Sequence, residues 1–256
     1  MAGYVRLNYG EDPSQFVEYF DGVNTKERAS TPCQKVAVLI HGGFWRGTYD
    51  LVLMNELGIF LASSVDAVYN AEYRRLSGGG GWPTTFDDVV AAIYSIINDV
   101  RNRYQTIAPL QIFLVGHSAG GHLSALAASY FTSQMIDQIS FYGISLGGVL
   151  DLEIGFSERI GDGVVAEFLG LRSAPSSDLL MDASPKHRLN GGEHLLVVTG
   201  GRDNVVPTSI ANSFIQRAKE LEADLAFADF PSEDHMDLIS TTSNSIALVV
   251  DYIKSR

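Results

Sequence analysis

The fold of the chain is indicated most clearly by Ile112-Phe-Leu-Val-Gly-His-Ser-Ala-Gly120. The stretch begins with a short apolar run, typical of a strand that is buried on both faces, and it leads into residues that suit a helix. Glycines stand two positions before and two positions after Ser118. This pattern predicts a sharp strand–turn–helix connection that raises the serine hydroxyl above the edge of a sheet.

The two glycines have a steric reason in this interpretation. A side chain at Gly116 or Gly120 would collide with the neighbouring strand or helix, and the turn holds the serine in a strained backbone conformation. The N–H of Ala119 and the positive end of the following helix dipole then point toward the reacting atom. A chance match of so short a pattern is the alternative, and the flanking strand and helix make it the weaker one.

Outward from this turn, short apolar runs alternate with segments of helical periodicity. The predicted strands are 36–40, 67–71, 112–115, 139–145, 195–199 and 226–230, with 17–20 as an added antiparallel strand. The predicted helices are 52–63, 84–103, 120–131, 208–221 and 237–254. The alternation predicts an α/β fold, with a mostly parallel central sheet and helices on both faces.

Composition narrows the class of protein. The chain has 256 residues, of which 46% are hydrophobic, and this is enough apolar material for a large core. Its 18 basic and 30 acidic side chains give a net charge of −12, which disfavours nucleic acid as a partner. No apolar run is long enough to span a membrane. Cys33, the one cysteine, fits a reducing compartment, and residues 1–20 show no signal-peptide pattern.

These features together predict a soluble, cytoplasmic protein made of one domain over residues 1–256. The segment 151–188 has weak periodicity, and we expect short helices and loops that cover one edge of the sheet and the site, with a small cap or none. The sequence leaves the oligomeric state open, a homodimer included.

A serine needs a base and an orienting acid before it can act as a nucleophile at neutral pH. For a site on such a turn, the acid and then the histidine are expected after the serine along the chain. Asp203 follows the apolar run 195–199, and His235 follows the run 226–230. Because catalytic groups gather at the carboxyl ends of parallel strands, these two residues with Ser118 form the predicted catalytic set.

Other acids and histidines fit less well. The competing acids, none of which follows a strong strand, are Asp162, Asp178 and Asp182. Of the other histidines, His117 is expected to pack sideways within the turn, and His122 lies on the helix that follows. No His-Glu-x-x-His motif or Cys/His cluster is present, so the sequence predicts neither a metal site nor a cofactor.

The loop His41-Gly-Gly-Phe-Trp45 follows the strand 36–40 directly. Its glycines would let backbone N–H groups approach a developing oxyanion and act together with Ala119. A plain Gly-Gly turn is the alternative.

These motifs resemble the α/β-hydrolase superfamily over nearly the whole chain. Within it, His41-Gly-Gly-Phe-Trp45 and Gly116-His-Ser-Ala-Gly-Gly-His122 resemble the kynurenine formamidase-like and hormone-sensitive-lipase-like esterase groups. Asn70-Ala-Glu-Tyr-Arg-Arg75 resembles these groups too. The resemblance implies a catalytic triad of Ser118, Asp203 and His235. It also implies an oxyanion hole, which the N–H groups of Gly43, Phe44 and Ala119 would form.

We therefore expect a serine hydrolase that acts on a small ester or amide without a metal. A short-acyl carboxylesterase is the first expectation, and an arylformamidase that hydrolyses N-formylkynurenine is the second. A non-catalytic ligand-binding protein on a hydrolase scaffold is the alternative of another class. Trp45, Tyr73 and Trp82 are expected either to line the substrate site or to pack in the core.

Overall fold

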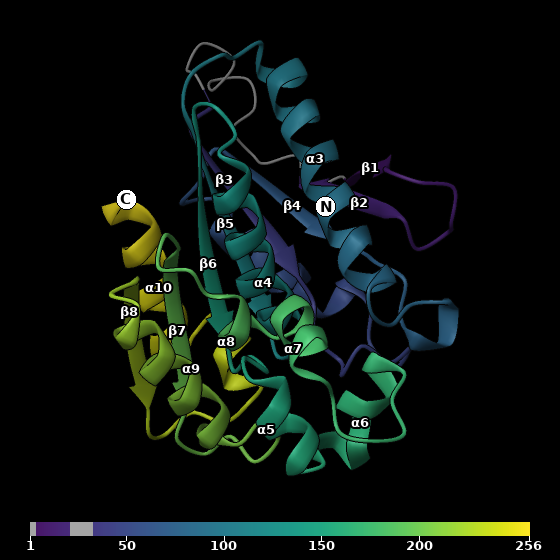
Figure 1. Ribbon diagram of the computed structural model, residues 1–256. Helices are drawn as coiled ribbons and strands as arrows, with labels where there is room; N and C mark the ends of the chain where they lie inside the picture. The colour runs from purple at the N-terminus through teal and green to yellow at the C-terminus, as the bar shows by residue number, and fades with distance from the viewer. Residues whose placement is uncertain (1–3, 21–32) are drawn as a thin grey trace.

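A single sheet organises the chain in the computed structural model, which describes residues 4–20 and 33–256. Its eight described strands lie in the order β1-β2-β4-β3-β5-β6-β7-β8 (Figure 1). Their bounds are β1 Tyr4–Asn8, β2 Phe16–Phe20, β3 Lys35–Ile40, β4 Ala67–Ala71, β5 Leu110–His117, β6 Ile139–Leu146, β7 His194–Gly200 and β8 Asp224–Phe230. In the order of the sheet, all neighbouring pairs from β4 to β8 are parallel. The pairs β1–β2 and β2–β4 are antiparallel. The α/β-hydrolase fold expected from the sequence is confirmed.

The strand order reverses direction at β3, which pairs with β4 on one side and with β5 on the other. Such a switch point leaves a crevice at the carboxyl ends of the two strands between which the order reverses. Here β3 leads into the loop at His41, and β5 leads into the turn at Ser118. The register places Ile40 opposite Gly116, so the two loops start side by side.

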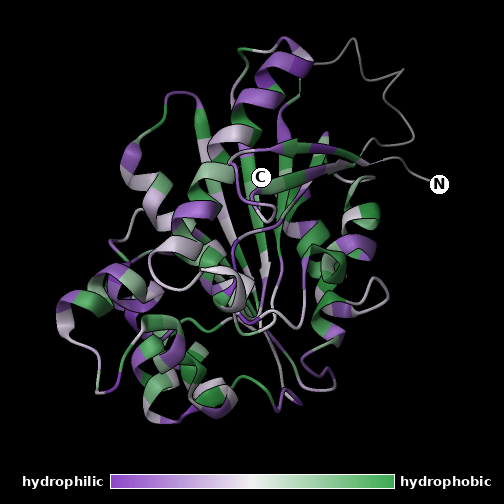
Figure 2. Cartoon of the chain, turned by 90° about the vertical axis from the view of Figure 1, so that its right-hand side faces the viewer, coloured by the Kyte–Doolittle hydropathy of each residue, from purple (hydrophilic) through white to green (hydrophobic). Residues whose placement is uncertain are grey.

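The core lies on both faces of the sheet. Val36, Val38 and Ile40 are buried on one face, and the alternate residues Ala37 and Leu39 are buried on the other. A parallel sheet that is covered twice requires such continuous apolar strands. In Figure 2 these strands appear as a hydrophobic interior between helices that carry hydrophilic segments.

Helices cover the two faces unequally. The helices that pack on the first face are α3 Thr84–Tyr104, α4 Ala119–Gln134 and α9 Thr208–Glu220, and those on the second are α2 Asn55–Leu61 and α10 Asn244–Ser255. In Figure 1, α3, α4 and α9 lie in front of the sheet. Within the described ranges, no helix is both long enough and apolar enough to cross a membrane.

Several details differ from the sequence prediction. The predicted helix 52–63 is a 3-10 turn at 51–54 followed by α2, which ends at Leu61. The strand β1 was not predicted, because its side chains are mostly exposed and it pairs only with β2. The last helix was predicted from residue 237, but α10 begins at Asn244 after a single 3-10 turn at 237–239. The Ser243 hydroxyl caps α10 by accepting a hydrogen bond from Ile246 N at 3.2 Å, and this fixes the later start.

The segment 151–188 forms short helices, as predicted. They are α5 Leu152–Ser157, α6 Ile160–Leu169, α7 Ser177–Ala183 and α8 Pro185–Arg188. Asp151 anchors the start of the segment, because its buried carboxylate accepts from Lys186 Nζ at 2.9 Å and from Ser213 Oγ at 2.7 Å. The two ends of the segment are thereby held together beside α9.

Candidate active site

Ser118 stands alone between β5, which ends at His117, and α4, which begins at Ala119. Its φ of 55° and ψ of −119° are unusual for a residue with a side chain. A backbone of this kind costs about 1–3 kcal/mol and persists only where the surrounding structure enforces it. Ser118 N donates to Leu146 O at 2.9 Å, and His122 N donates to Ser118 O at 3.1 Å, so strand β6 and helix α4 both hold the turn.

The glycines around Ser118 are required by close packing of the backbone. A Cβ at Gly116 would overlap the carbonyl oxygen of Gly120. A Cβ at Gly120 would overlap the carbonyl oxygen of Ile40 and lie 2.5 Å from that of His41. Neither glycine has a positive φ, so the space is needed for the approach of three backbone segments and not for an unusual dihedral angle.

Asp203 and His235 meet beyond the ends of β7 and β8. His235 Nδ1 donates to Asp203 Oδ2 at 2.7 Å, and both side chains are buried. The second carboxylate oxygen of Asp203 accepts from Val205 N at 2.8 Å and from Val206 N at 2.9 Å. Burial by itself would raise the pKa of Asp203, but the bonds from His235 and from the two N–H groups hold that pKa below its usual value. An ionised Asp203 fixes the proton on His235 Nδ1 and leaves Nε2 free to accept one.

His117 connects the turn at Ser118 to the loop that carries His235, a role that the sequence did not predict. Its Nε2 lies 2.9 Å from the backbone oxygen of His235, and the centres of the two rings are 4.5 Å apart. Burial lowers the pKa of His117 to about 3, so its ring is neutral and Nε2–H is the donor. No hydrogen bond joins the Ser118 hydroxyl to His235 among the described residues, and such bonds often tighten only around a substrate.

The loop after β3 lies directly against Ser118. A Cβ at Gly42 would stand 2.9 Å from Ser118 Cβ and 2.8 Å from His117 O, so only glycine fits there. Gly43 has φ 110°, Phe44 has φ 54° and Trp45 has φ 55°. The N–H groups of Gly43 and Phe44 have no acceptor within the described ranges, and Ala119, as the first residue of α4, has none within its helix.

The predicted aromatic contacts with substrate are only partly consistent with the structure. Trp45 and Tyr73 are 0% exposed, which favours the core-packing alternative for both. Trp45 stacks on Phe168 of α6 at 4.3 Å, and Tyr73 stacks on His41 at 4.2 Å. Trp82 is partly exposed, and its backbone N–H donates to Phe168 O at 2.8 Å.

Two other aromatic residues lie at the loop 41–45, Tyr49 beside it and Phe44 within it. Tyr49 is 49% exposed, and its ring lies next to Gly43, where an added Cβ would be 3.0 Å from Tyr49 Cβ. Phe44 lies against Gly161 of α6, with an added Cβ there 3.1 Å from the Phe44 ring. The segment 151–188 therefore packs on the loop that adjoins Ser118. Sequence reasoning missed Tyr49, because it lies in a loop without periodicity.

No three histidine, cysteine or carboxylate side chains in residues 4–20 and 33–256 gather as ligands for a metal ion.

Comparisons with known proteins give the family. The model of the BD-FAE family matches residues 23–217. The chain is 24% identical over 287 aligned residues to Esterase LipC of Mycobacterium tuberculosis, an alignment that covers 97% of this chain and 64% of LipC. It is 31% identical over 120 residues to Neutral cholesterol ester hydrolase 1 of Pongo abelii, which covers 44% of this chain and 29% of that protein. The chain thus spans less than two thirds of each of these relatives.

Solved structures share the fold. A truncated carbohydrate esterase from gut microbiota superposes with a TM-score of 0.78 at 18% identity, covering 100% of this chain and 95% of that one.

Proposed function

The chain belongs to the BD-FAE family, and we propose that it is a serine carboxylesterase that cleaves small esters through an acyl-enzyme on Ser118. The observation that supports this most strongly is the Asp203–His235 pair at 2.7 Å, held by His117 beside the strained turn of Ser118. The names of both relatives, an esterase and a cholesterol ester hydrolase, agree with ester cleavage.

In the proposed first half-reaction, Ser118 Oγ attacks the acyl carbon while His235 Nε2 takes the hydroxyl proton. The carbonyl oxygen becomes an oxyanion, which the N–H groups of Gly43, Phe44 and Ala119 stabilise. The C–O bond to the alcohol then breaks, and His235 returns the proton to the leaving oxygen. In the second half-reaction, water attacks the acyl-enzyme with the same proton transfers and releases the carboxylic acid.

Short acyl groups fit this site best. Ser118 is 3% exposed and His235 is 6% exposed, so little of either residue is open to solvent. Phe44, pressed against Gly161, further limits the space next to the oxyanion loop. Such confinement favours acetyl and propionyl esters over long chains.

The test is a kcat/KM series over p-nitrophenyl acetate, butyrate and octanoate together with N-formylkynurenine, run on the wild type and on Ser118→Ala. We expect the acetate to be the best substrate and Ser118→Ala to lose essentially all turnover. Ser129→Ala is the matched control, because Ser129 is also a buried serine, on the same helix α4. Unchanged hydrolysis by Ser118→Ala would contradict the mechanism. A strong preference for N-formylkynurenine would instead identify an arylformamidase, and no turnover of any substrate would favour a binding protein.

A cytoplasmic location also remains our proposal, and the single cysteine is its support.

A further inference from the structure

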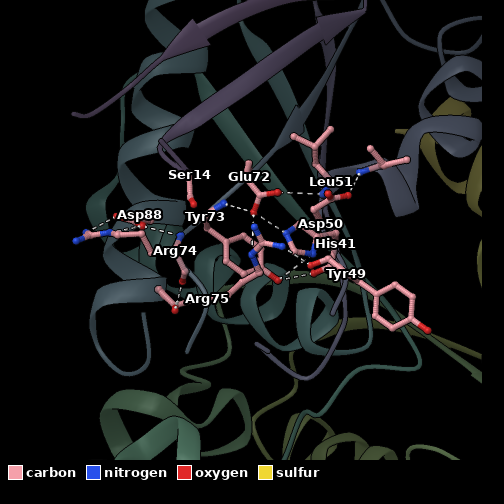
Figure 3. Close-up of polar contacts among 12 residues, drawn as sticks. Ser14, His41, Tyr49, Asp50, Leu51, Glu72, Tyr73, Arg74, Arg75 and Asp88 are labelled. Carbon is pink, nitrogen blue, oxygen red and sulfur yellow. Dashed lines mark hydrogen bonds and ion pairs between the residues drawn. The ribbon is translucent and has the colours of Figure 1, made fainter. Parts of the chain in front are cut away.

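A polar cluster that contains the buried side chains of His41 and Glu72 lies next to the loop 41–45 (Figure 3). His41 directly follows β3 and Glu72 directly follows β4, and the parallel register pairs Ile40 with Ala71. The two side chains therefore emerge next to each other at the same edge of the sheet. His41 is 0% exposed and Glu72 is 3% exposed. Neither is part of the proposed triad.

Glu72 is held as a carboxylate. Burial by itself would raise its pKa, but the hydrogen bond and charge of His41, the N–H of Tyr73 and the guanidinium of Arg75 keep that pKa below its usual value. Figure 3 shows contacts from Glu72 to Leu51 on one side and toward His41 and Tyr73 on the other. One oxygen accepts from Tyr73 N at 2.9 Å, and the other accepts from Leu51 N at 3.1 Å.

The contacts of the His41 ring define its protonation. Nε2 lies 3.1 Å from Glu72 Oε1, and Nδ1 lies 2.7 Å from the carbonyl oxygen of Gly42. A carboxylate and a carbonyl oxygen can only accept hydrogen bonds, so each ring nitrogen must carry a proton. The geometry therefore makes His41 an imidazolium that is paired with Glu72.

The carbonyl that His41 contacts belongs to the peptide group whose N–H is that of Gly43. We propose that the buried Glu72–His41 ion pair polarises the Gly42–Gly43 peptide and so strengthens the Gly43 N–H as a donor to the oxyanion. This inference rests on the proposed function, in which Gly43 is such a donor. Hydrogen bonds in a chain polarise one another, and a charged donor at one end has the largest effect in a site that excludes water.

The other titratable groups around the His41–Glu72 pair leave the cluster with a net positive charge. Arg75 lies 3.5 Å from Glu72, so two cations face one carboxylate and leave one positive charge. The Tyr73 hydroxyl donates to His41 O at 2.7 Å, and the Tyr9 hydroxyl donates to Glu72 O at 2.7 Å. Burial raises the pKa of both tyrosines well above the usual range, so both stay neutral. On the other side of Gly42, His117 is neutral as well.

Glu72→Gln tests the proposal, because it removes the charge that holds the imidazolium and keeps the size of the side chain. With p-nitrophenyl acetate we expect kcat to fall by about 10- to 100-fold, less than the 10²–10³-fold that complete loss of an oxyanion donor typically costs. KM should change little, since the oxyanion exists only in the transition state. The affinity for a trifluoromethyl ketone, which forms a tetrahedral adduct with an oxyanion, should fall by the same factor as kcat/KM.

The pH profile separates polarisation from simple support of the loop. In Glu72→Gln the charge of His41 is no longer balanced by a carboxylate, so the deficit in kcat/KM relative to the wild type should be larger at alkaline pH than at acid pH. A kcat within 3-fold of wild type, or a loss that is the same at every pH, would overturn the proposal.

Two further variants keep the test decisive. His41→Asn, whose amide can still donate to Gly42 O but carries no charge, should lower kcat with KM unchanged, and wild-type kcat would overturn the proposal even if Glu72→Gln does not fold. Asp88→Asn is the matched control, because Asp88 is a buried carboxylate paired with Arg74 at 2.7 Å in the same part of the chain. It should lower stability without changing the shape of the pH profile. Ser118→Ala tests the proposed function separately, so its loss of activity with a wild-type-like Glu72→Gln would reject the polarisation alone.

Discussion

Replacing Gly120 by alanine should damage both stability and activity, because three backbone segments meet at this position. The new Cβ would overlap Ile40 O, and it would lie 2.5 Å from His41 O and 2.7 Å from Ile40 C. All of these atoms belong to the backbone at the end of β3, a central strand that cannot rotate away. The turn at Ser118 and strand β3 must therefore separate.

Two opposing effects set the size of the change. Overpacking costs about 1–3 kcal/mol, and contacts with a fixed main chain favour the upper end of that range. Alanine gains back about 1 kcal/mol at most, because it is the better helix former and Gly120 lies in α4. The net loss is about 2 kcal/mol, which for a chain of this size lowers Tm by about 4–8 °C. Because the displaced strand leads into the loop 41–45, which carries the proposed oxyanion donors, a shift near 1 Å should also lower kcat by about 100-fold.

Thermal unfolding followed by circular dichroism, together with kcat on p-nitrophenyl acetate, measures both effects. Gly78→Ala is the control, since Gly78 is exposed, has no atom within 4 Å of an added Cβ and has no positive φ. It should match the wild type in both assays. If Gly120→Ala also kept the wild-type Tm and kcat, the argument that close backbone packing requires this glycine would be refuted.

Further predictions concern the acid of the proposed triad and the histidine of the turn. Asp203→Asn removes the charge that faces His235 Nδ1 at 2.7 Å, so kcat on p-nitrophenyl acetate should fall by roughly 10³–10⁴-fold, and a loss below 10-fold would contradict its role. Burial lowers the pKa of His117 from 6.5 to about 3, so the unfolded chain binds this proton more readily than the folded one. Protonation of His117 therefore does not lower the free energy of unfolding above pH 6.5. As the pH falls from 6.5 toward 3, that free energy decreases by up to about 1.4 kcal/mol per pH unit. His117→Gln should flatten this dependence in urea unfolding between pH 4 and 7, and equal slopes for the two proteins would show that His117 is not held neutral.

Much of the fold could be predicted because each buried strand carries its own signal. The run 36–40 is apolar at every position and 195–198 is too, which only a doubly covered parallel strand requires. The predicted positions of Ser118, Asp203 and His235 followed from the same signal, since each lies just beyond a strand that the pattern identified. The exposed edge strand β1 has no such pattern, and tertiary pairing with β2 alone defines it.

The surroundings of the site could not be predicted, because they depend on which side chains meet across the fold. Nothing in the sequence distinguishes Trp45 and Tyr73, which are buried, from an aromatic residue that borders the site, such as Tyr49. Glu72 lies in the segment 70–75, whose pattern predicts no role for this residue, and its partner His41 is 31 residues away along the chain. Pairing of neighbouring strand ends brings these two together, and that register is a property of the folded sheet.

The central claim is that Ser118 is the nucleophile, and covalent labelling tests it most directly. The purified protein would be treated with a fluorophosphonate, and the modified peptide would be located by mass spectrometry while residual activity on p-nitrophenyl acetate is followed. We predict one label per chain, on Ser118, with loss of activity in proportion to labelling and no label on Ser118→Ala. Labelling at another residue, or full activity in a protein whose Ser118 is fully modified, would contradict the claim.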